Sequence, residues 1–145
     1  MIDRGFTHVA FTIRDADASI DFYARYGGFQ LVHHRADPDT GRRVVWLSDL
    51  TRPFAIVLIE DPQPTFPLAG WNHLGIGVLD RDEVDRLAAL ARAEGRLVLA
   101  PTDSGPPVGY WAIIGDPAGH QLEVSYGQEV ALAVEDPTIG PEPPL

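Results

Sequence analysis

The chain of 145 residues contains no cysteine and no lysine, so its 11 basic residues are all arginines. The absence of cysteine excludes disulfides, thiolate metal ligands and cysteine nucleophiles. The absence of lysine excludes Schiff-base chemistry and a lysine nucleophile. Histidine, aspartate and glutamate are therefore the side chains that remain as metal ligands or acid–base groups.

Positive charge is scarce, and the formal net charge is −10. Neutralising phosphates requires clustered basic side chains, so this charge argues against a nucleic acid or an anionic membrane as a partner. The sequence contains no long apolar run and no apolar signal region near its first residue. We therefore expect a cytoplasmic protein whose partner is a small molecule.

A pattern at residues 6–13, FTHVAFTI, returns at residues 71–78 as WNHLGIGV. Both read as short strands with apolar residues at alternate positions, which places His8 and His73 on the opposite, polar faces. The two histidines are separated by 73 − 8 = 65 residues. The same offset relates three further pairs: Asp15 with Asp80, Asp17 with Asp82, and Trp46 with Trp111. The chain is thus predicted to contain two copies of one supersecondary unit.

Each copy is predicted to follow the order β-α-β-β-β, which makes the fold α+β with two tandem βαβββ modules. The predicted elements of the first copy are a strand at 6–13, a helix at 18–27 and strands at 29–35, 43–48 and 54–60. In the second copy a helix follows Asp80, and strands are predicted at 96–100, 110–115 and 121–126. Module 1 (5–61) and module 2 (70–127) form one domain, 1–127, joined by a proline-rich linker at 61–70. Residues 128–145 are predicted to be an extended tail.

Glu123 lies on the polar face of the last predicted strand, and in such a unit the first and last strands can lie side by side at the centre. Two imidazoles and one carboxylate, from His8, His73 and Glu123, suit Fe, Mn, Ni, Co or Zn. Applying the offset of 65 to Glu123 gives Leu58. Glu60 shares the face of Leu58 and is predicted to be a fourth ligand or the catalytic proton carrier.

Four segments resemble the vicinal oxygen chelate superfamily, which includes glyoxalase I, fosfomycin-resistance thiol transferases, extradiol dioxygenases and bleomycin-binding proteins. These segments are THVAFTI around His8, SIDFY at 19–23, NHLGIGV around His73 and DPAGHQLE at 116–123. The resemblance covers roughly residues 6–127. It implies a cupped mixed sheet and a metal bound by His8, His73 and Glu123. It fits no single subfamily, because glyoxalase I has a second glutamate where this chain has Leu58, and the fosfomycin transferases use a lysine.

Two functions follow as hypotheses. The first is a metal-dependent enzyme, glyoxalase-like, thiol-transferase-like or dioxygenase-like, whose metal chelates two adjacent oxygens of a small substrate. The second is a metal-free protein that binds a drug-like molecule in an acidic cup. Trp46, Tyr110 and Trp111 are the candidate substrate-binding residues, although half-buried sheet positions are the commoner use of aromatics. His120 is predicted to be structural, and a homodimer is expected.

Overall fold

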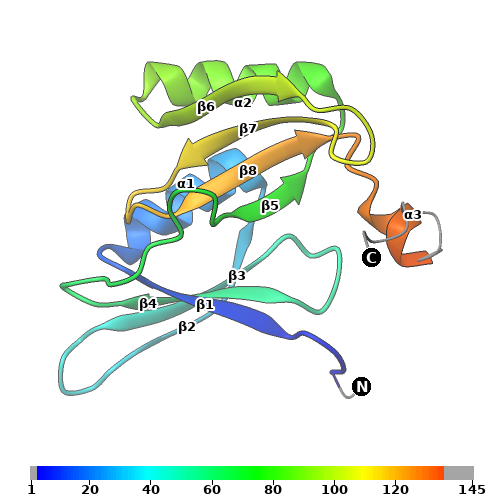
Figure 1. Cartoon of the computed structure of the whole chain (residues 1–145). Coiled ribbons are helices and arrows are strands. Elements are labelled where there is room, and N and C mark those ends of the chain that lie inside the picture. The colour runs from blue at the N-terminus through cyan, green and yellow to red at the C-terminus, as the bar shows by residue number, and fades with distance from the viewer. Residues whose placement is uncertain (1–2, 136–145) are drawn as a thin grey trace, which may run out of the picture. The chain divides into compact units, whose positions relative to one another are not determined.

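The structure is a computed structural model that describes residues 3–135 of the chain (Figure 1). The predicted order of elements is confirmed. The first module contains β1 (His8–Ile13), α1 (Ala16–Gly27), β2 (Gln30–Ala36), β3 (Arg43–Ser48) and β4 (Ala55–Glu60). The second contains β5 (Leu74–Gly77), α2 (Arg81–Ala93), β6 (Leu97–Asp103), β7 (Tyr110–Gly115) and β8 (Gln121–Tyr126), and α3 (Val130–Glu135) follows it.

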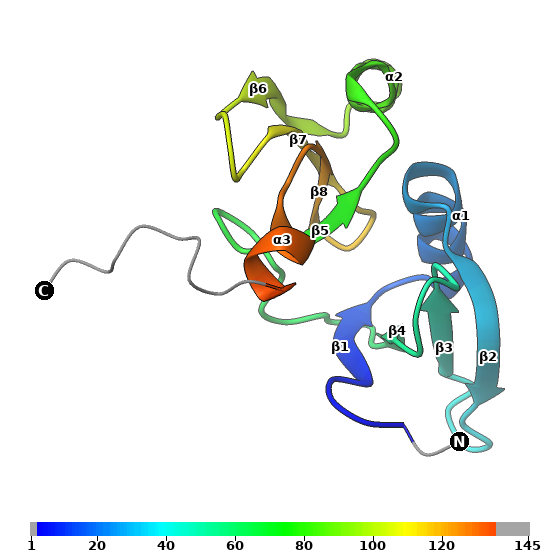
Figure 2. The same ribbon diagram turned by 90° about the vertical axis from the view of Figure 1, so that its right-hand side faces the viewer.

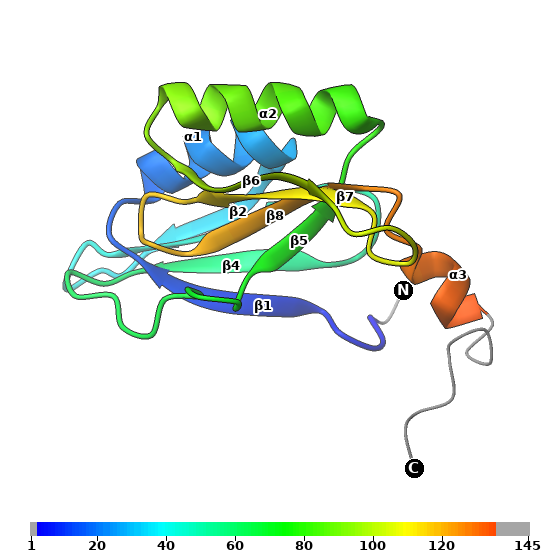
Figure 3. The same ribbon diagram turned by 45° about the horizontal axis from the view of Figure 1, so that its top comes forward.

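Each module contributes one four-stranded sheet, in the orders β1-β4-β3-β2 and β5-β8-β7-β6. The first sheet is mixed, as predicted: β1 runs parallel to β4, whereas β3 is antiparallel to both β4 and β2. Figure 3 shows β1 and β4 running side by side. The first and last strands of each module are therefore neighbours, as expected. The prediction that both lie at the centre is wrong within each sheet, because the first strands, β1 and β5, are edge strands.

The described residues divide into two compact units, one formed by 3–74 with 115–122 and the other by 75–114 with 123–135. These units differ from the sequential modules because the turn between β7 and β8 belongs to the first unit. Two buried side chains of that turn bind the first module: Asp116 accepts a hydrogen bond from Tyr23 in α1, and His120 contacts the Thr12 carbonyl in β1. Long-range hydrogen bonds, which no local pattern encodes, decide where the boundary falls.

Helix α1 begins at Ala16, two residues before its predicted start. Asp15 is the N-cap, and its carboxylate accepts a hydrogen bond from the Ala18 amide at 3.1 Å. The helix contacts β2, β3 and β4, and Figure 2 shows it along one side of that sheet. Its aromatic residues Phe22 and Tyr23 are almost fully buried. This face of the first sheet is therefore the core, and the opposite face is left for a site.

Helix α2, predicted to follow Asp80, has an apolar stripe at helical spacing. Its buried residues are Val84, Leu87, Ala88 and Ala91, and Asp80 caps the first turn by accepting from the Glu83 amide at 2.8 Å. The helix contacts β6. Of the helices in residues 3–135, none is both long and apolar enough to cross a membrane.

The prediction of an extended tail from residue 128 is wrong for the part that the structure describes. Residues Val130–Glu135 form the short helix α3, which follows β8 (Figure 1). The Glu129 amide donates to the Pro107 carbonyl at 2.9 Å, which fastens the chain just before the helix. Within residues 128–145, proline and glycine are absent from this helix and occur only after it. The remainder of the predicted tail, 136–145, lies outside the described residues.

Candidate functional site

The first unit contains a cavity of about 720 Å³ on the side of its sheet that faces away from α1. Its lining includes His8, Trp46, Val57, Ile59, Arg35 and Arg52. Strand register explains why these residues meet, because residues paired across neighbouring strands point to the same face. Ala10 pairs with Val57, and Val57 pairs with Trp46. His8 shares the face of Ala10 by alternation, so the polar face predicted for the first strand lines this cavity.

His8 is oriented by its neighbour in sequence. The Thr7 hydroxyl lies 3.0 Å from Nδ1 of His8, within hydrogen-bond distance. A partner on one ring nitrogen fixes the orientation of an imidazole and leaves the other nitrogen to bind a ligand. Nε2 of His8 is therefore the atom that could coordinate a metal.

Trp46 lines the same cavity, and its residue surface is 43% exposed. Its ring contacts the imidazole of His33 with a centroid separation of 4.8 Å. A partly exposed aromatic surface beside a cavity suits an apolar or aromatic ligand. The substrate-binding role of Trp46 stays a prediction, and its position is compatible with that role.

The prediction that Leu58 and Glu60 lie on the face of His8 is wrong. Leu58 pairs with Phe11 and Glu60 pairs with Ile13, so both point toward the side covered by α1. The connection between β3 and β4 spans residues 49–54, one residue longer than the connection at 116–120 between β7 and β8. A uniform offset of 65 therefore does not hold in β4, and a slip of one residue moves a side chain to the other face.

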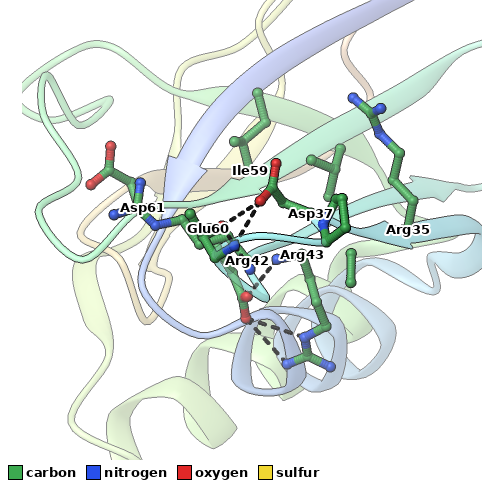
Figure 4. A pocket seen from close by; sticks show the side chains of 11 residues that line it. Arg35, Asp37, Arg42, Arg43, Ile59, Glu60 and Asp61 are labelled. Carbon is green, nitrogen blue, oxygen red and sulfur yellow. Dashed lines mark hydrogen bonds and ion pairs between the residues drawn. The ribbon is translucent and has the colours of Figure 1, made fainter.

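The Glu60 carboxylate is instead part of a structural network (Figure 4). It accepts hydrogen bonds from the amides of Ala16 at 3.0 Å and Arg43 at 2.7 Å, and from Nε and Nη2 of Arg43 at 3.3 and 3.2 Å. Ala16 is the first residue of α1, so the negative charge stabilises the helix N-terminus. The role of Glu60 as a proton carrier stays a prediction, but these contacts favour a structural role.

Replacing Glu60 with glutamine is expected to lower the free energy of unfolding at pH 7 by about 2 kcal/mol, because charged hydrogen bonds are lost. Burial alone would raise the pKa of Glu60, but the hydrogen bonds from Ala16 and Arg43 outweigh it and hold the pKa below its ordinary value of 4.5. A lowered native pKa gives stability that is present above the unfolded-state pKa and is lost as the pH falls through the native pKa.

The two proteins should therefore differ most near neutral pH and converge in acid. Urea unfolding between about pH 7 and pH 3 measures this difference. Glu129→Gln, which changes an exposed carboxylate, is the control. A destabilisation by Glu60→Gln that is the same at every pH would contradict the assignment.

In the second unit, Glu123 is a carboxylate on β8 whose residue is only 6% exposed. The Gln128 amide donates to its Oε1 at 3.1 Å. A Cβ atom added at Gly75 in β5 would lie 3.8 Å from the same oxygen. Because Gly75 has no side chain, the space on β5 beside the Glu123 carboxylate stays open.

His73 immediately precedes β5, and its Nδ1 lies 2.7 Å from the Trp71 carbonyl oxygen. A carbonyl can only accept, so Nδ1 must carry the proton and donate it. In the neutral ring Nε2 then carries the lone pair, which is the form of histidine that binds a metal.

The other two predicted substrate-binding residues face opposite sides of the second sheet. The Tyr110 hydroxyl donates to Asp85 of α2 at 2.5 Å, and the Arg81 guanidinium lies 3.9 Å from the centre of its ring. These contacts turn Tyr110 toward the helix and favour a structural role. Trp111, the next residue, donates from Nε1 to the Ser104 hydroxyl at 2.9 Å. Its substrate-binding role stays a prediction.

His120 is structural, as predicted. It is 2% exposed, its Nδ1 accepts from the Leu68 amide at 2.9 Å, and its Nε2 lies 2.9 Å from the Thr12 carbonyl. Because Nδ1 accepts, Nε2 donates and the ring is neutral. The imidazole thus joins the proline-rich linker to β1, and it leaves no nitrogen for a ligand.

Within residues 3–135, no group of three or more His, Asp or Glu side chains is compact enough to hold a metal ion. The predicted ligands are divided between the two units: His8 and His73 belong to the first and Glu123 to the second. Their union at one ion therefore stays a prediction.

Solved structures of low sequence identity share the fold. A possible glyoxalase from Bacillus cereus is 20% identical, with a TM-score of 0.65 and coverage of 85% of this chain and 99% of that chain. A variant of the fosfomycin resistance protein FosX from Listeria monocytogenes is 16% identical, with a TM-score of 0.66 and coverage of 92% and 99%. Glyoxalase I from Zea mays is 23% identical, with a TM-score of 0.65, and the match covers 83% of this chain but only 43% of the maize chain.

Sequence comparisons define the family. An uncharacterised protein of Pseudomonas aeruginosa is 38% identical over 132 residues, which cover 89% of this chain and 93% of the relative. The model of the Glyoxalase/Bleomycin resistance protein/Dioxygenase superfamily matches residues 5–124. That range includes β1 to β7, both long helices and the first four residues of β8, so it contains His8, His73 and Glu123. The chain therefore belongs to the Glyoxalase/Bleomycin resistance protein/Dioxygenase superfamily.

Proposed function

We propose that this protein is a metal-dependent enzyme in which His8, His73 and Glu123 bind one divalent ion, Fe, Mn, Ni, Co or Zn. A small substrate would chelate the ion through two adjacent oxygens. The observation that carries the proposal is the hydrogen bond from Nδ1 of His73 to the Trp71 carbonyl at 2.7 Å. It selects the tautomer that metal-binding histidines adopt and fixes the direction of the ring.

The other two donors fit the same chemistry. Nδ1 of His8 lies beside the Thr7 hydroxyl, so Nε2 is the donor that remains. Glu123 is a nearly buried carboxylate of β8, and a carboxylate oxygen is a common ligand of these metals. When bound, a divalent ion acts as a Lewis acid toward a developing enolate or alkoxide. The chain itself would position the substrate against Trp46 and the apolar strand residues of the cavity.

A related protein of the same fold supports this chemistry. The FosX variant from Listeria monocytogenes was solved with Mn(II) and 1S,2S-dihydroxypropylphosphonic acid, a ligand with hydroxyls on adjacent carbons. Its identity of 16% gives likeness of fold only. We infer that the substrate is small and oxygen-rich. The proposed reaction is a lyase-like, transferase-like or dioxygenase-like step. A cytoplasmic homodimer is part of the proposal.

A second candidate function is metal-free binding of a drug-like molecule. It is favoured by the 720 Å³ cavity with Trp46 in its lining. The two candidates differ in whether metal removal changes the protein. Under this alternative, stability and ligand binding are unaffected by a chelator.

The deciding experiment is elemental analysis of the purified chain after equilibration with the five metals and removal of the excess. The wild type is expected to retain about one ion per chain, and His73→Ala to lose at least tenfold in metal affinity. His34→Ala removes an exposed histidine of β2 and is the matched control. Metal bound to the native state should also raise the melting temperature, and EDTA should reverse it. Negligible metal in all three proteins would reject the proposal and favour the alternative.

A further inference from the structure

We propose that the cavity of the first unit binds an organic acid, with Arg52 and Arg35 recognising its anionic oxygens. This inference rests on the proposed function, since it names the substrate class of the same site. Although the chain has a net charge of −10, two arginines are in the lining of this cavity. Asp3 is the acidic residue among the lining residues.

The two arginines differ in their partners from the five arginines of the described chain that form ion pairs. Arg25, Arg43, Arg81, Arg86 and Arg96 all form ion pairs with carboxylates. Within residues 3–135, neither Arg35 nor Arg52 forms a salt bridge, and Arg52 donates from Nε to the Thr51 hydroxyl at 3.3 Å. Burial alone would raise the pKa of Asp49, but hydrogen bonds from Thr51 and the nearby charge of Arg52 lower it, so Arg52 also faces a carboxylate of its own connection. A guanidinium has five donors in a fork that matches carboxylate and phosphate oxygens, so donors of both arginines remain for a ligand.

Strand register gives the two arginines separate places in the cavity. Arg52 lies in the connection that enters β4, whose first residue, Ala55, pairs with His8. Arg35 pairs with Val44, which pairs with Ile59 near the other end of β4. Ile59 is four positions after Ala55, which corresponds to roughly 13 Å along the strand. The arginines therefore belong to opposite ends of the cavity, with Arg52 at the His8 end.

The surface between them is apolar. Val57 and Ile59 of β4 and Trp46 of β3 line the cavity between the two charged ends. A pocket with an apolar wall and a few placed polar groups holds a ligand by its body and orients it by its charges. The matching ligand has an apolar or aromatic body and an acid group beside the oxygens that would meet His8. An aromatic 2-oxo acid has this arrangement, and Arg35 would receive a second anionic group on a longer substrate.

Three probes separate charge from shape. Phenylglyoxylate has an aromatic ring, adjacent oxygens and a carboxylate, whereas 1-phenyl-1,2-propanedione keeps the ring and the adjacent oxygens without the charge. Phenyl phosphate tests whether the same arginines accept a phosphate. Titration calorimetry on the full chain, with the metal and again in EDTA, gives an affinity for each probe.

Phenylglyoxylate is expected to bind at least tenfold more tightly than the neutral dione, because hydrogen bonds to charged groups are involved. Arg52→Gln should weaken phenylglyoxylate binding about tenfold or more and leave the dione within about twofold. Arg35→Gln should weaken it less, since that arginine lies at the far end. Arg25→Gln, which changes an arginine of α1 paired with Asp21, is the control.

Raising the salt concentration from about 0.05 M to about 0.5 M should weaken the binding of phenylglyoxylate and leave the binding of the dione unchanged. The Arg52→Gln and Arg35→Gln double variant overturns the inference if it binds phenylglyoxylate as tightly as Arg25→Gln. Equal affinity of the wild type for acid and dione, or no binding of either, also overturns it. Failure of the metal proposal would give a different result. The preference for phenylglyoxylate over the dione, and its dependence on Arg52, would then be the same with the metal and in EDTA. Tighter binding of phenyl phosphate than of phenylglyoxylate would support the role of the two arginines in recognising anionic oxygens, and it would identify a phosphate as the substrate class.

Discussion

Replacing Asp116 with alanine is expected to lower the free energy of unfolding by about 4 kcal/mol, because three buried donors lose their acceptor at once. The carboxylate accepts from the Tyr23 hydroxyl at 2.8 Å and from the amides of Ala118 and His120, each at 2.8 Å. Asp116 is 6% exposed and Tyr23 is fully buried. Water cannot readily replace the lost acceptor, so each donor carries a desolvation cost of about 1–3 kcal/mol.

Tyr23 is held as a donor in this network. Its burial raises the pKa of the phenol far above the usual range, and the adjacent Asp116 carboxylate raises the pKa further. The hydroxyl therefore keeps its proton across the neutral range. The loss of stability in Asp116→Ala should accordingly be similar across the neutral range.

Urea unfolding of Asp116→Ala and Asp116→Asn measures the effect. Asparagine keeps one carbonyl oxygen for the two turn amides, so Asp116→Asn should cost about 1 kcal/mol. Tyr23→Phe should cost about 1 kcal/mol in the wild type and nearly nothing in Asp116→Ala, which would demonstrate coupling in a double-mutant cycle. Equal losses in the alanine and asparagine variants would show that the turn does not depend on this acceptor.

Asp116 and Tyr23 also bear on why the family could be recognised from the sequence. Both belong to segments that carried the resemblance, SIDFY at 19–23 and DPAGHQLE at 116–123. The structure shows that the two segments are joined by the hydrogen bond between Tyr23 and Asp116. Part of the family pattern thus serves to hold the fold together through this hydrogen bond. Glu123, at the end of the second segment, is instead a candidate metal ligand. A sequence motif does not by itself separate these roles.

The elements that local chemistry determines could be predicted from the sequence. Asp15 and Asp80 each precede a predicted helix, and each accepts a hydrogen bond from the first turn of that helix. Strands β3, β7 and β8 have the predicted bounds. Alternation placed His8 opposite Phe11, and the structure has His8 on the cavity side and Phe11 in the core. Capping and alternation act within a few residues, so one sequence contains enough information for them.

Features that depend on distant residues could not be predicted. The face of Glu60 depends on the length of one connection, and an offset taken from Trp46 and Trp111 does not measure that length. The membership of the Asp116 turn in the first unit depends on contacts about a hundred positions away in the chain, such as the one between His120 and Thr12. The position of Arg35 and Arg52 in the cavity lining was missed for the same reason. An arginine next to Pro53 is typical of a solvated turn until strand register places its connection at the His8 end of the cavity.

Replacing Gly109 with alanine is expected to destabilise the second unit by roughly 3 kcal/mol or more, from backbone strain and steric overlap. Gly109 has a φ of +87°, a conformation that side chains other than glycine rarely adopt. A Cβ atom there would meet the Tyr126 carbonyl oxygen and would lie 2.8 Å from the Gly127 carbonyl carbon. These are backbone atoms at the end of β8, so no side-chain rotation relieves the overlap.

Gly105 provides a matched control in the same loop. Its φ is +67°, but nothing lies within 4 Å of an added Cβ atom, so Gly105→Ala should lose only about 1 kcal/mol for the backbone conformation. The difference between the two variants in thermal or urea unfolding measures the steric cost alone. Because Gly109 contacts the end of the strand that carries Glu123, Gly109→Ala should also lower metal affinity, whereas Gly105→Ala should retain it. Equal destabilisation by the two substitutions would mean that the loop moves away from β8 without cost, and the position of Glu123 would then not depend on this contact.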